Sequence, residues 1–253
     1  MKGMRKILPL LGIAATSLLV VGAASPGDAP EHDWTGAYAI RMRVGSVTRM
    51  PLMGRERSVT TTLVMAGVRR GPQGWVQSHR VCDVRIEGRI PMTVPPAFVA
   101  SLPAREFAAS FPTAIVGSPY ALDMGTEAIG FDAAATGGRV PTQASDPGAR
   151  DSDGDGNPGA TIHGHFPLFG DVSIYFAQRL HLALRGTQVA PGRIAGTLDV
   201  LDLRQETLGA SSRFFRRTLD VRPDAAASTF VMVAIPAPLT CGELRQREAA
   251  LFR

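Results

Sequence analysis

Residues 172–185 read Val-Ser-Ile-Tyr-Phe-Ala-Gln-Arg-Leu-His-Leu-Ala-Leu-Arg. Large apolar side chains recur at the even positions, and most odd positions carry small, polar or basic ones. Successive side chains of a β-strand point to opposite faces, so this period of two predicts a strand with one buried face. In a helix, with 3.6 residues per turn, residues two positions apart would not share one face.

Similar strand patterns surround this stretch on both sides. They cover residues 34–44, 59–65, 75–87, 121–131, 160–166, 193–203 and 230–235. Gly71-Pro72-Gln73-Gly74 and Pro191-Gly192 are turn sequences, so each predicts a hairpin between the strands beside it.

Three segments predict helix. Residues 95–102 and 104–111, bounded by prolines, are predicted as short helical turns. Residues 243–252 are predicted as a C-terminal helix, with Thr240 as its N-cap and Glu243 placed for a capping box. The fold class expected is all-β: one antiparallel barrel-like domain, or a sandwich, over residues 34–253 with short helices and a C-terminal helix.

The first residues have the three parts of a cleavable export signal. A basic start is followed by an apolar run over residues 7–21 and then by small residues, so we expect a signal peptide over residues 1–24 and a polar leader over 25–33. The expected location is periplasmic or extracellular. The chain has 27 Lys and Arg against 22 Asp and Glu; loss of Lys2, Arg5 and Lys6 leaves 24 against 22, a net charge of +2. So small a charge does not indicate a nucleic-acid partner, and no transmembrane segment is expected after cleavage.

Cys82 and Cys241 are the two cysteines of the chain. Exported proteins meet an oxidising compartment, so we expect a disulfide between them. Two unpaired buried thiols are the alternative.

One loop carries specific chemistry. Residues 151–159 read Asp-Ser-Asp-Gly-Asp-Gly-Asn-Pro-Gly, near the end of a long loop expected over 136–159. Oxygen ligands at alternate positions followed by a glycine suit a hard cation, so Asp151, Asp153, Asp155 and Asn157 predict a Ca²⁺ site. A solvated acidic turn is the alternative, because Asp, Asn and Gly favour turns.

This loop resembles the calcium loops of EF-hands, dockerins and thrombospondin type 3 repeats over about nine residues. It departs from them at its twelfth position, where Ile162 replaces the bidentate glutamate. A further ligand must therefore come from elsewhere, with Asp132, Asp146 and Asp171 as candidates. The extended pattern Asp-x-Asp-Gly-Asp-Gly-x-Pro-Gly-x-Thr is similar to one in exported bacterial proteins of uncharacterised function. That resemblance implies export and a β-rich body.

Three further features of the sequence are less specific. His163 and His165, two residues apart, can chelate Zn²⁺ or Cu²⁺ if a third ligand such as His79 or His181 lies near, or they can be surface histidines. The Trp34-Thr35-Gly36-Ala37-Tyr38 opening resembles that of lipocalins, with Tyr for Trp and no other lipocalin signature; an aromatic plug at one end of the core is the alternative. Residues 213–217 form a basic and aromatic cluster that can meet an anionic surface or be a solvated loop.

These features favour an exported, calcium-binding β-barrel-like protein with a structural or ligand-binding role, in which Ca²⁺ orders residues 151–159. The alternatives are a secreted hydrolase with scattered catalytic residues, or a lipocalin-like carrier of a small apolar ligand. Neither Gly-x-Ser-x-Gly nor His-Glu-x-x-His occurs in the sequence, so no catalytic residue is assigned.

Overall fold

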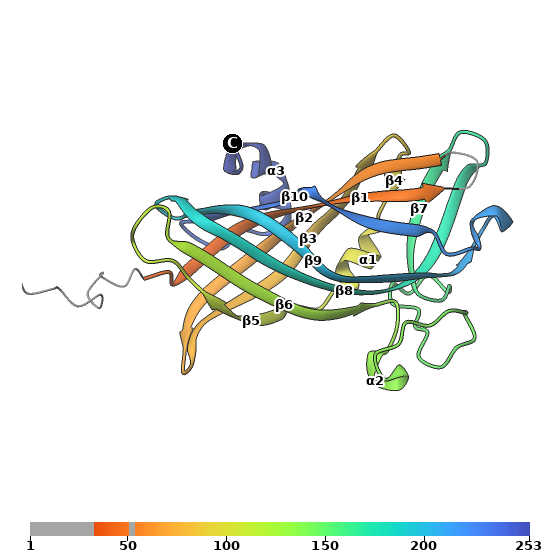
Figure 1. The fold of residues 1–253 in the computed structure, drawn as a ribbon, viewed down its shortest axis with the longest axis horizontal. Coiled ribbons are helices and arrows are strands. Elements are labelled where there is room, and N and C mark those ends of the chain that lie inside the picture. Colours follow the sequence, from red (N-terminus) through yellow and green to blue (C-terminus); the bar gives the residue numbers. More distant parts are fainter. Residues whose placement is uncertain (1–32, 51–53) are drawn as a thin grey trace, which may run out of the picture.

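The computed structural model describes residues 33–50 and 54–253. The strand predicted from residues 172–185 is the longest strand in this part of the chain (Figure 1). This strand, β8 (Gly170–Ala190), is longer than the pattern that predicts it. Val172, Ile174 and Leu184 are buried, whereas Arg185 on the opposite face is exposed. The alternation predicted from the sequence is therefore confirmed.

Eight antiparallel strands close into a ring around one interior. Their order is β2-β1-β10-β9-β8-β6-β5-β3, and the pairing of β2 with β3 completes the circle. The strands are β1 (Gly36–Met50), β2 (Gly54–Gly71), β3 (Gly74–Gly88), β5 (Arg105–Ser110), β6 (Pro119–Ile129), β8, β9 (Arg193–Ala210) and β10 (Asp220–Ile235). The circular order decides between the barrel and the sandwich in favour of the barrel. The seam between β9 and β10 is paired only over residues 193–197 and 229–233, so the rest of these two strands is not hydrogen-bonded to each other as a ladder. Both predicted hairpins are present, β2–β3 and β8–β9.

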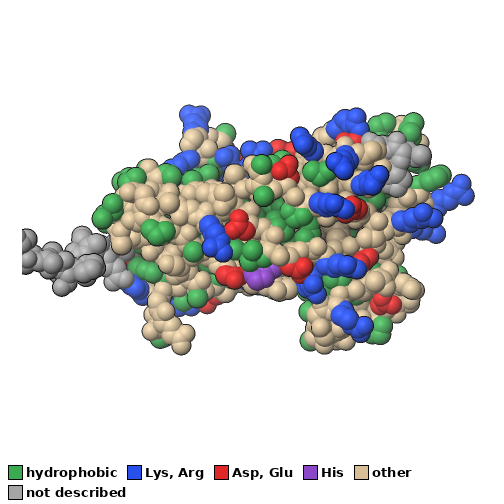
Figure 2. Space-filling view, viewed as in Figure 1, with side chains coloured by type: hydrophobic (Ala, Val, Ile, Leu, Met, Phe, Trp, Pro, Cys, Tyr) green, Lys and Arg blue, Asp and Glu red, His purple; other side chains and the backbone are tan. Residues whose placement is uncertain are grey.

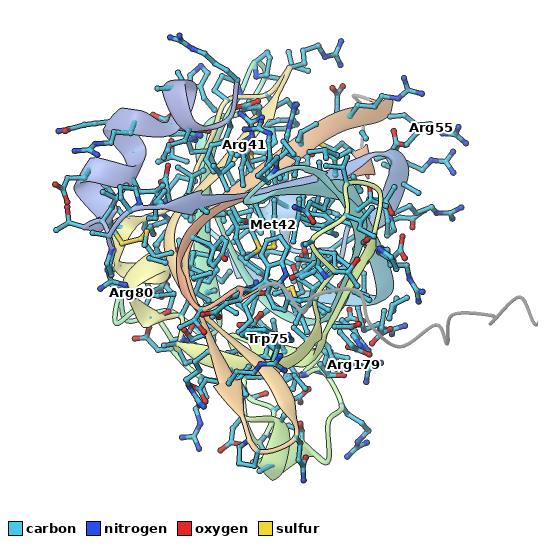
Figure 3. All side chains as sticks on the ribbon, turned by 90° about the vertical axis from the view of Figure 1, so that its left-hand side faces the viewer. Arg41, Met42, Arg55, Trp75, Arg80 and Arg179 are labelled. Atoms are coloured by element: carbon cyan, nitrogen blue, oxygen red, sulfur yellow. A yellow bond between two sulfur atoms is a disulfide. The ribbon has the colours of Figure 1, made fainter. Side chains whose placement is uncertain are left out.

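Alternation of side chains around the ring is visible along the barrel (Figure 3). Met42 lies inside the ring, whereas its neighbour Arg41 lies outside, as do Arg80 and Arg179. Strand β1 thus contributes its even residues to the interior and its odd residues to the outer surface.

The wall between β8 and β3 is built from two different pairs of strands. At one end of the barrel β6 and β5 fill it, and at the other end β7 (Ala160–Phe166) and β4 (Met92–Thr93) do. The short helix α1 (Pro96–Ser101) packs between them, with Phe98 edge-on to Phe176 at 6.1 Å between ring centroids. The helical prediction for 95–102 is confirmed in α1, and the helical prediction for 104–111 is wrong.

Strand β5 replaces the second predicted helix because its partner is distant in sequence. It pairs with β3 over Trp75–His79, and this pairing sends Phe107 into the core. Such long-range hydrogen bonds override the weak local preference of a short segment.

Aromatic side chains fill the β5–β6 end of the barrel. Trp34 is fully buried; its indole N–H donates to the carbonyl of Pro112 at 2.8 Å, and its ring packs 5.3 Å from that of Phe111. Trp75 and Tyr120 also contact Phe111. The opening around Trp34 therefore forms the aromatic plug that was one of its two interpretations.

The C-terminal helix α3 (Cys241–Leu251) lies on the outside of the barrel and is tied to it by the Cys82–Cys241 disulfide. Thr240 and Glu243 form the predicted capping box. Cys82 reaches the outer face because β3 has a bulge where Leu63 and Val64 of β2 pair with Asp83 and Val81. The disulfide and the helix are both confirmed.

Two short helical elements complete the fold, α2 (Ala133–Thr136) and η1 (Arg213–Phe215). The predicted signal peptide, and all of the polar leader except Asp33, lie outside the described residues. Among the residues that are described, no helix has the length and apolar character needed to cross a bilayer.

Candidate ligand cavity and acidic loop

An apolar cavity of about 290 Å³ occupies the half of the barrel that the aromatic plug leaves unfilled. Its inner end meets the plug at Met42, Met124 and Leu182, which belong to both. Phe98 from α1 and Ile162 from β7 complete the wall. The size is near the lower end of the range for small-molecule sites in proteins.

Inward-facing residues around the cavity remain partly accessible. Leu180, Val200 and Leu203 point inward from β8 and β9, yet none of them is fully buried. The equivalent positions at the plug end, such as Leu184 and Leu198, are at most 1% exposed. The difference means that side chains close one half of the barrel and leave the other half hollow.

Polar groups interrupt the apolar lining. Hydroxyl side chains of β1 and β2 line one side of the cavity, and Gln178, Gln205 and Glu127 line the other side. Burial raises the pKa of the Glu127 carboxyl, and the nearby Arg105 guanidinium works against this shift. A ligand that fits the cavity can therefore be mainly apolar while carrying some hydrogen-bonding groups.

The cavity reaches the surface beside an ion pair. Glu56 is 7% exposed and bonds to the guanidinium of Arg89. Both residues line the cavity, and the Arg89 side chain is 72% exposed. This mouth lies at the end of the barrel away from Trp34.

A buried polar chain links β6 and β3, the two strands on either side of β5. The Tyr120 hydroxyl donates to the Gln77 side-chain carbonyl at 2.9 Å, and the Gln77 amide lies 2.7 Å from His79 Nε2. The amide N–H donates, so Nε2 accepts and the proton of the neutral ring is on Nδ1. Burial, assisted by the positive charge of Arg105, lowers the pKa of His79 to about 3.

Acidification is expected to destabilise the protein through His79. The unfolded chain takes up a proton near pH 6.5 and the folded chain does not, so this contribution is complete above that pH and is lost as pH falls towards 3. Between pH 7.5 and 5.5 we expect a loss of about 1.4 kcal/mol in the free energy of unfolding, measured by urea titration. His79→Leu should be less stable at pH 7.5 but lose less on acidification; an unchanged pH slope would contradict the assignment.

The acidic loop brings three carboxylates together on the outside of the barrel. One oxygen from each of Asp151, Asp153 and Asp155 lies within 4.8 Å of the others. Asp151 accepts hydrogen bonds from the backbone N–H groups of Gly154, Asp155 and Gly156 at 2.8 to 3.2 Å. The loop closes on itself through pairing of Asp151 with Gly159.

Asp153 is the least satisfied of the three carboxylates. Its Oδ2 accepts the Thr161 N–H at 2.9 Å, whereas Oδ1 is buried and has no partner among the described residues. Burial raises the pKa of Asp153, and the charges of Asp155 and Asp151 raise it further. Asp155 Oδ2 accepts the Thr161 hydroxyl at 2.7 Å. A divalent cation among these oxygens would relieve the repulsion and satisfy the unpartnered atom.

The other proposed ligands lie elsewhere. Asp132 caps α2 and pairs with Arg150, Asp146 caps the turn at Thr142, and Asp171 bonds to His165. None of the three joins the carboxylate group in the described part of the chain. The Asn157 backbone N–H donates to Asp155, which keeps this residue beside the site. Ile162, at the position of the EF-hand glutamate, faces the cavity instead.

The histidines do not assemble into a metal site. His163 and His165 are exposed and bond to Ser173 and Asp171. His79 is buried inside the barrel, and His181 bonds to Asp123. Within residues 33–50 and 54–253, the three aspartates are the only group with ligand atoms close enough to share a metal.

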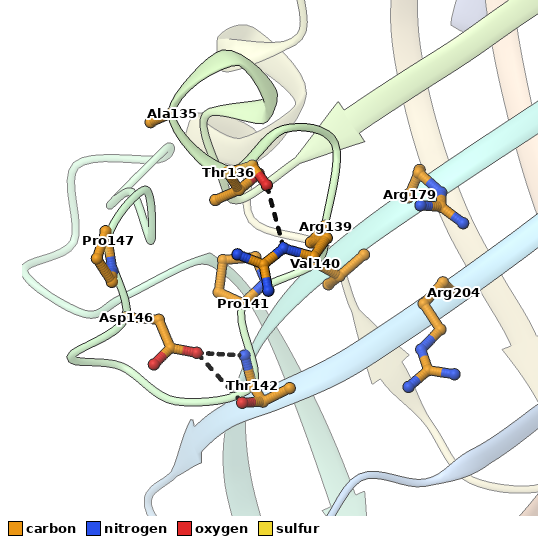
Figure 4. Close-up of a pocket in the computed structure, with 10 residues that line it drawn as sticks. All are labelled: Ala135, Thr136, Arg139, Val140, Pro141, Thr142, Asp146, Pro147, Arg179 and Arg204. Carbon is orange, nitrogen blue, oxygen red and sulfur yellow. Dashed lines mark hydrogen bonds between the residues drawn. The ribbon is translucent and has the colours of Figure 1, made fainter.

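A second, more polar pocket of about 630 Å³ lies where the segment after α2 folds against the outside of β8 and β9 (Figure 4). Its charged groups hold the surrounding structure. Arg139 donates to the Thr136 carbonyl, Asp146 accepts from Thr142, and Arg179 bonds to Asp202. Its lining does not include any residue of the Asp151–His165 stretch, where the hydrolase alternative expects a polar cleft.

The cavity residues were not predicted from the sequence. A signal for them was present in β2, where Ser58, Thr60 and Thr62 occupy the same face as buried Val64 and Ala66. Hydroxyl residues on a core-facing register indicate a section of the interior that is not tightly packed. Comparisons with protein-family models, with curated proteins and with solved structures found no match.

Proposed function

We propose that this protein binds a small, mainly apolar molecule inside its barrel, as a carrier or sensor of that molecule. The observation that carries the proposal is the hollow half of the barrel, where Leu180, Val200 and Leu203 point inward and stay partly accessible while the side chains at the plug end are closely packed. Barrels of about eight strands can hold one small ligand. Transfer of an apolar molecule from water into such a cavity is favoured by roughly 25 cal/mol per Å² of buried apolar surface.

Binding of the fluorescent apolar probe N-phenylnaphthylamine tests the proposal. Val200→Phe places a ring in the cavity and is expected to weaken probe binding by at least about tenfold. Leu201→Phe is the matched control, because the adjacent side chain is 51% exposed on the outside. Equal binding to both variants, or no saturable binding to the wild type, would contradict an interior site.

Ca²⁺ at the acidic loop is the second part of the proposal. It is supported by the carboxylate spacing, by the buried free oxygen of Asp153 and by the hard-oxygen character of the donors. Asp151, Asp153 and Asp155 would hold the ion. Its role would be to order residues 151–159, which lead directly into the cavity strand β7.

The protein is proposed to act after export, in the periplasm or outside the cell. The Cys82–Cys241 disulfide supports this location, because such bonds persist in oxidising compartments.

A further inference from the structure

Two apolar side chains project from the end of the barrel that carries the cavity mouth. Leu168, in the β7–β8 turn, is 72% exposed, and Phe214, in η1, is 48% exposed. Aromatic packing supports them on the barrel side. The ring centroids of Phe169 and Phe214 are 5.0 Å apart, and those of buried Phe215 and Phe166 are 4.2 Å apart. Exposed apolar side chains that lie together and are bordered by polar residues mark an interaction surface, whereas single ones do not.

Arginines surround these apolar side chains. Arg213 lies over the Phe214 ring at 5.1 Å, and Arg216 and Arg217 follow on the same exposed segment. None of the three forms an ion pair with another described residue. We call Leu168, Arg213, Phe214, Arg216 and Arg217 the tip patch.

Further basic side chains lie on β1, β2 and β10 at the same end of the barrel. Arg49 of β1 is directly opposite Arg55 of β2, and Arg222 of β10 lies one row away, opposite Val47. Like charges that lie directly opposite each other destabilise a sheet. Asp220 of β10, opposite Arg49, is the acidic residue beside these arginines. Figure 2 shows basic side chains gathered with apolar ones at the right-hand end of the molecule.

The tip patch and the cavity mouth are parts of one packed unit. Phe215 and Phe169, which support the tip patch, share a hydrophobic cluster with Ile90 and Met50. Ile90 and Met50 also line the cavity. A surface that contacts the tip patch therefore lies beside the entrance to the barrel.

We propose that the tip patch docks this end of the barrel onto an anionic lipid bilayer. Phe214 and Leu168 would enter the interface between headgroups and acyl chains, and the arginines would contact lipid phosphates. Lipid phosphates would supply the anionic partners that these arginines lack, since within the described ranges none of the three forms an ion pair and Arg216 donates only to the Ala210 carbonyl. The docked orientation turns the cavity mouth towards the membrane, which would be the source or destination of an apolar ligand.

Vesicle flotation of the full-length mature protein tests the docking. Vesicles of phosphatidylcholine alone are compared with an equal mixture of phosphatidylcholine and phosphatidylglycerol, at low and at high salt. We expect binding to the anionic vesicles only, weakened by salt. Arg213→Gln/Arg216→Gln/Arg217→Gln and Leu168→Ser/Phe214→Ser should each reduce the bound fraction by at least about tenfold.

Matched controls carry the same chemical changes elsewhere. Arg69→Gln/Arg80→Gln/Arg247→Gln removes three exposed arginines outside the tip patch, and Ile115→Ser/Val116→Ser removes exposed apolar side chains at the plug end. Both should bind as the wild type does. No binding to anionic vesicles, or equal loss in tip and control variants, would overturn the proposal.

A dimer in sedimentation that dissociates in Leu168→Ser/Phe214→Ser, without vesicle binding, would also overturn the proposal by assigning the tip to self-association. Docking is measured without any cavity ligand. Failure of membrane docking is therefore distinguishable from failure of ligand binding in the barrel.

Discussion

Reduction of the Cys82–Cys241 disulfide is expected to lower the free energy of unfolding by about 5 kcal/mol. The bond joins residues 159 positions apart, and in the chain-entropy model so long a closed loop strongly restricts the unfolded state. The loss should also loosen α3 on the barrel, because the bond joins the two within a cluster that includes Leu244 and Phe252. Urea unfolding of oxidised and reduced wild-type protein gives the difference directly.

Reduced wild type is the best reference because both sulfur atoms stay in the core, where Cys82 is 3% exposed. Cys82→Ala/Cys241→Ala should match it within about 1 kcal/mol, the further difference reflecting lost packing. The urea dependence of both should steepen, since an uncrosslinked unfolded chain exposes more surface. A reduced protein with unchanged stability would mean that the native contacts alone hold α3 in place.

Removal of Ca²⁺ is expected to destabilise the wild-type protein by about 3 kcal/mol when the ion was present at a hundred times its dissociation constant. Asp153→Asn should abolish most of the stability that Ca²⁺ adds, because it removes one charged ligand. The amide oxygen of the variant can still accept the Thr161 N–H. Without metal, the variant should be more stable than the wild type. In the wild type, burial and the charges of Asp155 and Asp151 raise the pKa of Asp153, so its ionised form is unfavourable there.

Calorimetric titration and urea unfolding, each in CaCl₂ and in EGTA, measure these effects. Asp171→Asn is the matched control, because this carboxylate was a candidate ligand but lies beside His165 with its side chain 93% exposed. It should retain the full calcium response. Equal stability of the wild type with and without calcium would reduce residues 151–159 to an acidic turn closed by its own hydrogen bonds.

The acidic loop and the cavity meet at one strand. Thr161 holds Asp153 and Asp155 on the outer side of β7, and the next residue, Ile162, lines the cavity on the inner side. Adjacent residues of β7 therefore connect the proposed cation site to the wall of the cavity.

Features that depend on a local sequence pattern were predictable from the chain alone. Alternation over 172–185 predicted the central strand and its buried face, Thr240 and Glu243 predicted the start of the C-terminal helix, and export chemistry predicted the disulfide. The three aspartates of the loop were also predicted as a group, because ligands two residues apart converge without help from distant segments. The strand, the helix start and the aspartate group are each set by neighbours in the chain, whereas the disulfide was predicted from the number of cysteines and the expected oxidising compartment.

The remaining features depend on contacts between segments that are distant in the chain. Residues 105–110 became a strand because β3 supplied hydrogen-bond partners from residues 75–79. The hollow half of the barrel also arises this way: periodicity says which side chains face inward, but not how far apart opposite walls stand. The short strands β4 and β7 with α1 complete the wall there, and the aromatic side chains that fill the other end do not reach it. The volume left over is a property of the closed ring, which no local stretch of sequence contains.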